Sequence, residues 1–196
     1  MPYRTPVAYV TAAEIKAFAD ITDTDQDALL DDLALAASER IDRFTGTWFA
    51  SETMTLEHDY YESHLLRLRC DLLTVTTLTN GDGTTITADK YWLDPVSGPP
   101  YRRIEIKPTS GVVFTYSGTA KRAISIEGTW GYAATAPQTV KEVAIEMVLW
   151  MLNRAPDHGM TSASSAFGSR QYSDEMPQEM FNKLRSYRRP KVITIA

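Results

Sequence analysis

The amino-acid sequence predicts an α+β protein in which an antiparallel β-domain is inserted between the second and third helices of a small helical bundle. Apolar residues recur at helical spacing before residue 46 and again after Pro137, whereas residues 53–128 alternate at the period of a strand and are rich in Thr, Val, Ile and Tyr. Neither helical segment has a partner for its own apolar stripe, so the two are expected to pack on each other.

The first two helices are marked by their start and stop signals. Thr11 and Glu14 have the spacing of a capping box, which predicts a short helix ending near Asp20. A second helix is expected to begin near Asp23–Asp25, because carboxylates favour the positive end of a helix dipole. Gly46 follows it as a left-handed stop. The apolar stripe of this helix consists of Leu29, Leu30, Leu33, Ala37, Ile41 and Phe44.

The alternating segment predicts six or seven short strands, enough for a compact sandwich or barrel. Asn80-Gly81-Asp82-Gly83 supplies residues that tolerate positive φ and predicts a hairpin turn. The strands are expected over residues 54–58, 66–68, 73–78, 91–93, 103–107, 112–114 and 123–127.

The pattern returns to helix after Pro137 and ends near Arg154, and a last helix follows Pro177, a residue that suits the first helical position. A basic, β-prone tail then forms an extended C-terminal arm. The expected domains are a helical core of residues 1–50 and 133–187, an inserted β-domain of residues 51–132, and the tail of residues 188–196.

Composition excludes several classes of protein. Cys70 is the single cysteine among 196 residues, so an internal disulfide framework is excluded. No apolar run approaches the roughly 18 residues of a membrane-spanning helix, and residues 1–10 lack the features of a secretory signal. We therefore expect no membrane partner and folding in the cytoplasm. A net charge of −5 argues against a protein whose main task is to bind nucleic acid.

The charge is unevenly distributed along the chain. Residues 1–46 carry nine acids and four bases, whereas residues 176–196 carry five bases and one acid. The opposite net charges of the two ends could steer head-to-tail contacts between copies of the chain. Alternatively, both charged segments are solvated faces without a function.

The most enzyme-like cluster is Glu57-His58-Asp59 with Glu62 and His64, because imidazole and carboxylates together can hold a transition metal. On a strand, however, Glu57 and Asp59 share one face while His58 points to the other, and no HExxH spacing is present. We therefore expect a solvated strand and turn, with no metal, no cofactor and no catalytic residue.

Gly128-Thr129-Trp130-Gly131-Tyr132 places two bulky aromatics where the strands give way to helix. A platform on which nucleic-acid bases stack is one interpretation, but flanking Lys or Arg is absent. We expect Trp130 and Tyr132 to fill a junction between the two domains.

Taken in order, several segments resemble the head-tail connector (adaptor) proteins of tailed bacteriophages. They are residues 9–16 (YVTAAEIK), 36–46 (AASERIDRFTG), 124–132 (ISIEGTWGY) and the helix after Pro137. The resemblance implies a virion protein of the neck between capsid and tail, made in the host bacterial cytoplasm. It also implies a ring, usually of twelve subunits, that docks on the portal protein, receives the tail or next neck component, and lets duplex DNA pass without sequence-specific binding. It implies no catalysis.

We expect the last helix and tail to be the docking arm. Apolar residues behind basic ones suit strand addition to a partner's sheet edge, assisted by attraction to an acidic surface. A terminus without a function is the alternative. The residues expected to contact the portal or a neighbouring subunit are Lys183, Arg185, Arg188, Arg189, Lys191, Val192, Ile193 and Ile195.

Two other functions stay open from the sequence alone. A small metal-dependent hydrolase would use the region of His58 and His64. A carbohydrate-binding β-domain would use exposed aromatic residues, namely Tyr60, Tyr61, Tyr91, Trp92 and Tyr101.

Overall fold

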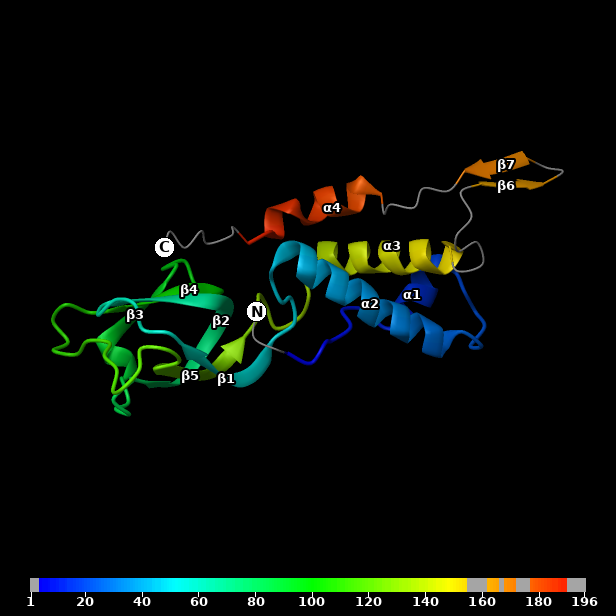
Figure 1. The fold of residues 1–196 in the computed structure, drawn as a ribbon. Coiled ribbons are helices and arrows are strands. Elements are labelled where there is room, and N and C mark those ends of the chain that lie inside the picture. The colour runs from blue at the N-terminus through cyan, green and yellow to red at the C-terminus, as the bar shows by residue number, and fades with distance from the viewer. Residues whose placement is uncertain (1–3, 155–161, 166–167, 172–176, 190–196) are drawn as a thin grey trace. The chain divides into compact units, whose positions relative to one another are not determined.

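The computed structural model of the chain describes residues 4–154, 162–165, 168–171 and 177–189 (Figure 1). The chain divides into two compact units. The sheet unit comprises Met1–Arg4 and Thr47–Ala136, and the helical unit comprises Thr5–Gly46 and Pro137–Ala196. The predicted α+β class, with the β-segment between the second and third helices, is confirmed.

The N-terminal half of the helical unit begins with α1 (Ala12–Ala19) and α2 (Asp27–Thr45). The predicted capping box is present: the Glu14 N–H donates to Thr11 Oγ1 at 3.2 Å, and the Thr11 N–H donates to Glu14 Oε2 at 2.9 Å. Asp20 ends α1 and Gly46 ends α2, both in the left-handed conformation (φ 54° and 71°). The stop signals were thus predicted correctly, whereas α2 begins later than Asp23–Asp25.

The C-terminal half contributes α3 (Gln138–Arg154), α4 (Gln178–Leu184) and the 3-10 turn η3 (Arg185–Tyr187). Pro177 is the N-cap of α4 rather than its first helical residue. Burial of one face of each helix stabilises the unit by the hydrophobic effect. Its buried apolar side chains include Ile15, Leu30, Ala34, Ala37, Ile41, Val140, Val143, Ala144, Met147, Val148, Met180 and Leu184.

A two-stranded antiparallel sheet, β6 (Ser162–Ser165) with β7 (Gly168–Gln171), lies between α3 and α4 in sequence. The predicted extended arm from residue 190 onward lies outside the described residues. Within the described part of the chain, no helix combines the length and the apolar character needed to cross a bilayer.

The sheet unit is built on five antiparallel strands in the order β1-β5-β2-β4-β3. A short 3-10 turn, η1 (Ala88–Lys90), precedes β3. The strands are β1 (Glu52–His58), β2 (Leu65–Thr79), β3 (Tyr91–Asp94), β4 (Tyr101–Ile106) and β5 (Ile124–Trp130).

The central strand β2 differs from the sequence prediction. Two separate strands were expected at 66–68 and 73–78, but β2 is continuous over 15 residues. Its first half pairs with β4 and its second half with β5, with register shifts between Leu72 and Thr74 and between Val75 and Thr77. Such bulges bend a strand, so one strand can serve two neighbours. The strand expected at 112–114 was also wrong, because these residues form no strand.

The predicted hairpin turn after β2 is confirmed. The Asn80 N–H donates to the Thr84 carbonyl at 2.7 Å, and Gly83 has φ 84°. The Asn80 side chain also donates to the Val113 carbonyl at 2.9 Å. This turn therefore holds the irregular segment around Val113 in place. The core beneath the sheet contains Leu56, Leu66, Leu72, Leu78, Ile104, Ile106, Phe114, Ile124, Ile126 and Trp130.

Candidate functional site

The structure describes half of the predicted partner-binding segment. Lys183 lies in α4, Arg185 lies in η3, and Arg188 and Arg189 follow η3 directly. The remaining predicted residues, Lys191, Val192, Ile193 and Ile195, lie outside the described residues.

Lys183 is held by an ion pair within the helical unit. Its Nζ lies 2.5 Å from Glu146 Oε1 on α3. This hydrogen bond raises the pKa of Lys183, with Glu146, Glu142 and Glu179 adding Coulombic attraction. Lys183 therefore stabilises the packing of α4 on α3 in the free chain. A partner's acidic group would have to compete with Glu146 for it.

Aromatic packing and a backbone hydrogen bond fix the end of α4 against the end of α2. The rings of Phe44 and Phe181 lie 4.8 Å apart, and the Arg188 guanidinium lies 5.6 Å from the centre of the Phe44 ring. The Arg189 N–H donates to the Thr45 carbonyl at 2.7 Å. The chain that continues from Arg189 therefore starts from a defined point at the C-terminal end of α2.

Sequence reasoning missed two basic residues at this place. Arg40 and Arg43 lie in the last turns of α2 and are exposed. They belong to residues 1–46, which carry a net negative charge, so the charge count alone does not reveal a basic surface there. Their distance from Gly46 could have shown where they lie, because both residues precede this helix stop by less than two turns. They are therefore at the C-terminal end of α2, where α4 also ends.

The predicted junction residues take different positions in the sheet unit. Trp130 is fully buried in the core under the sheet, and its indole N–H donates to the Met54 carbonyl at 3.1 Å. Tyr132 is half-buried with its ring 5.6 Å from that of Phe49, and its backbone N–H donates to the Trp48 carbonyl at 2.7 Å. A junction role for the pair stays a prediction.

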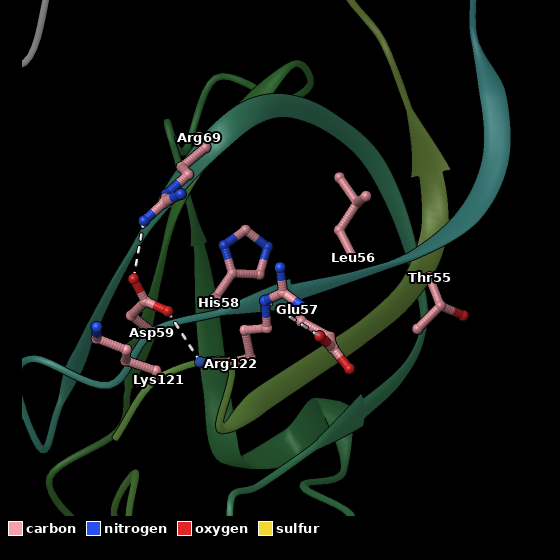
Figure 2. A pocket seen from close by; sticks show the side chains of 8 residues that line it. All are labelled: Thr55, Leu56, Glu57, His58, Asp59, Arg69, Lys121 and Arg122. Atoms are coloured by element: carbon pink, nitrogen blue, oxygen red, sulfur yellow. Dashed lines mark hydrogen bonds and ion pairs between the residues drawn. The ribbon is translucent and has the colours of Figure 1, made fainter. Parts of the chain in front are cut away.

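A hollow of about 820 Å³ opens at the end of β1 and is lined by residues of the cluster that the sequence marks as enzyme-like (Figure 2). Asp59 organises its rim. Arg69 Nη2 donates to Asp59 Oδ2 and the Arg122 backbone N–H donates to Asp59 Oδ1, both at 2.8 Å. These contacts lower the pKa of Asp59, the Arg122 N–H most strongly. The Arg122 guanidinium also lies 4.0 Å from Glu57.

His58 is one of the residues that line this hollow, and its side chain is buried. Its side chain packs against Trp130 with ring centres 5.6 Å apart, and its Nε2 has no hydrogen-bond partner among the described residues. Burial, together with the positive charge of Arg69, lowers the pKa of His58 to about 4, and the negative charge of Asp59 opposes this shift only in part. The imidazole is therefore neutral at physiological pH.

The buried imidazole predicts a loss of stability in mild acid. Because the unfolded chain binds a proton near pH 6.5 and the folded chain only near pH 4, the stabilisation is complete above pH 6.5 and falls as the pH drops from 6.5 to 4. The limit of this loss is about 3 kcal/mol. Denaturation by urea at several pH values measures it, with a His58→Phe variant as the comparison. A wild-type curve parallel to that of the variant would contradict a buried neutral His58.

The geometry gives no support to a metal-dependent hydrolase. His64 is exposed, and its Nδ1 lies 2.8 Å from Ser63 Oγ. Across the described ranges, no group of three His, Cys, Asp or Glu side chains is placed to hold a metal ion. The two carboxylates of the rim face arginines rather than each other.

The aromatic residues considered for carbohydrate binding differ in their exposure to solvent. Tyr91 is buried in the core, whereas Trp92 alternates to the outside and is 50% exposed beside Lys107. Tyr60 packs against Tyr116 with ring centres 5.1 Å apart, and Tyr61 is exposed.

No protein-family model and no curated protein sequence matches the chain. Solved structures do match. A chain from the neck of the empty GTA particle, computed with C6 symmetry, is 18% identical with a TM-score of 0.61, covering 95% of this chain and 92% of that one. A chain from the neck of the native GTA particle, computed with C12 symmetry, is 19% identical with a TM-score of 0.59 and 97% of both chains covered.

A chain from the virion of the native gene transfer agent (GTA) particle is 20% identical, with a TM-score of 0.62 and coverage of 95% and 92%. This chain has the fold of these particle chains. At 95% coverage only about 10 of the 196 residues fall outside the match, far fewer than the sheet unit contains. The inserted sheet is thus part of the shared fold rather than an addition peculiar to this chain.

Proposed function

We propose that this chain is a structural protein of a virion neck, a head-to-tail adaptor whose copies form a ring. The ring docks on the portal protein, joins the capsid to the tail or next neck component, and leaves a channel for DNA. The observation that carries the proposal is the fold shared with two chains from GTA particle necks over nearly the whole length of this chain and of each of those chains.

Two further observations support the proposal. One of the matched necks was computed with C12 symmetry, which favours a ring of twelve copies here as well. The net charge of −5 suits the wall of a channel, because a negative surface repels the phosphates of duplex DNA and does not hold it in transit.

The experiment that tests the function mixes the purified chain with portal-containing capsids of the particle that encodes it, followed by electron microscopy. The expected result is ring-shaped density beneath the portal vertex. Capsids that stay bare, together with normal particle assembly when the gene is deleted, would contradict the proposal.

The C-terminal arm is proposed as the portal-docking or neighbour-docking element. The seven residues after Arg189 span at most about 25 Å when extended. The bond between Arg189 and Thr45 gives this segment a fixed origin. Val192, Ile193 and Ile195 would then add a strand to a partner's sheet edge, and the basic residues would attract an acidic surface.

Removal of residues 190–196 is expected to weaken attachment to portal-containing capsids at least about tenfold, equivalent to roughly 1.4 kcal/mol. This cut keeps the contacts of Arg188 and Arg189 with α2, so the helical unit stays intact. Co-sedimentation with capsids measures attachment, and circular dichroism checks the fold.

A second truncation, after Tyr187, serves as the control for the contacts that Arg188 and Arg189 make with α2. It removes Arg188 and Arg189 as well and is expected to lower the melting temperature of the helical unit. Unchanged attachment of the chain that ends at Arg189 would refute the docking arm.

A further inference from the structure

The helical unit carries opposite charge at its two ends, and each end exposes a different surface. The loop between α1 and α2 forms one end, while the C-terminal end of α2, beside the end of α4, forms the other (Figure 1). The 19 residues of α2 separate these two places by about 28 Å. A single copy therefore cannot bring them together.

The first end combines acidic and apolar groups. Phe18 in the last turn of α1 is 60% exposed and Leu29 in the first turn of α2 is 43% exposed. The acidic residues close to them in sequence are Asp20, Asp23, Asp25, Asp27, Asp31 and Asp32. We call this surface the acidic corner.

Two of these carboxylates are already used within the unit. Asp27 pairs with Lys16 at 2.7 Å, and Asp31 accepts the N–H of Ala12 at 3.1 Å. By contrast, Asp23 and Asp25 are exposed and form no hydrogen bond or ion pair with any described side chain. Exposed apolar groups within a charged rim are the composition of a protein–protein interface.

The second end is basic and aromatic. Arg43 and Arg185 are exposed beside the half-buried rings of Phe44 and Phe181, and Arg188 covers Phe44. Arg40 and Arg189 lie at the same end, with Glu39 and Asp42 as the opposing acids. Five bases against two acids leave this surface positive. We call it the basic end.

We propose that the acidic corner of one copy docks on the basic end of the next copy in the ring, with Phe18 and Leu29 packed against the aromatic pair. This inference rests on the proposed function. A ring closes only through a heterologous interface, in which two different surfaces of each subunit fit each other. The helical unit supplies such a pair, with opposite charge for steering and apolar groups at the centre.

The two surfaces also indicate that the molecule bound at the acidic corner is a second copy of this chain. A negatively charged corner repels nucleic acid and anionic lipid, so neither explains its exposed Phe18 and Leu29. Complementary charge lies on the same chain, so every copy carries both halves of the contact.

Charge reversal on each side tests the contact. One variant carries Asp23→Lys with Asp25→Lys, and the other carries Arg43→Glu with Arg185→Glu. Association of each variant, their equimolar mixture and the four-fold variant is measured by sedimentation at low salt. We expect each two-fold variant alone to associate at least about tenfold more weakly than wild type, because like charges then face each other.

The mixture and the four-fold variant are expected to regain association. In the mixture, subunits alternate, so each reversed corner meets a reversed end and each native corner meets a native end. A matched control, Glu62→Lys with Glu105→Lys, adds the same charge on exposed positions of the sheet unit and is expected to associate like wild type.

Two-fold variants that associate like wild type, or a mixture that fails to recover, would overturn the head-to-tail contact. A wild-type chain that stays monomeric at every concentration would overturn it as well. The function itself is judged separately by attachment of wild type to portal-containing capsids, so a ring built through other surfaces would leave the proposed function standing.

Discussion

Replacing Trp130 with alanine is expected to destabilise the sheet unit by about 3–5 kcal/mol, because it leaves a cavity at the largest fully buried side chain. The substitution removes the packing between the indole and His58 and deprives the Met54 carbonyl of its indole donor. Since a domain of this size is stable by only about 5–15 kcal/mol, a large part of the unit's stability would be lost.

Urea denaturation followed by circular dichroism measures this loss. The matched control is Trp92→Ala on β3, where the ring is half exposed and contacts Lys107 at 5.8 Å. We expect it to cost less than about 1 kcal/mol. Equal effects of the two substitutions would show that Trp130 does not fill the core in the way described.

Gly128→Ala is expected to cost about 3 kcal/mol, although it adds a single methyl group. A Cβ on Gly128 would lie 2.2 Å from the carbonyl oxygen of Thr74 on the adjacent strand and 3.3 Å from Leu72 Cδ1. Backbone cannot move aside as a flexible side chain can. The pairing of β2 with β5 at the bulge around Val75 would therefore open.

Gly118→Ala is the control for replacing a glycine where the added methyl group meets no other atom. Gly118 has φ 82°, and a Cβ at this residue would meet no atom within 4 Å, so only backbone strain of about 1 kcal/mol is expected. Comparing the thermal stability of the two variants separates the cost of backbone strain, present in Gly118→Ala, from the cost of the steric clash with Thr74, present in Gly128→Ala. A Gly128→Ala protein as stable as Gly118→Ala would contradict the close approach of β2 and β5.

The helices could be predicted from sequence because their signals are local. Thr11 and Glu14 bond each other across three residues, and Gly46 ends α2 through its own backbone conformation. The course of β2 could not be predicted in this way. Its continuity through Leu72 depends on pairing with β4 and β5, both of which come much later in the chain. Strand limits follow from such distant partners more than from local preference.

For the same reason, only those features of the candidate site that depend on neighbouring residues in the sequence could be predicted. Alternation along a strand correctly places His58 on the face opposite Glu57 and Asp59, but only the folded sheet shows that this face is the core and that Trp130 covers the ring. Likewise, the basic character of residues 183–189 is evident from composition, whereas the contact of Arg188 with Phe44 depends on how α4 packs against α2 and α3.

The hydrogen bond from the Tyr132 N–H to the Trp48 carbonyl brings the chain's departure from the helical unit next to its return. The segment Thr47–Ala136 therefore begins and ends at neighbouring positions. A linker of a few residues could join these positions at a small entropic cost of loop closure. Both ends of the inserted sheet therefore lie close together, which is the geometry expected of a domain inserted between two consecutive helices.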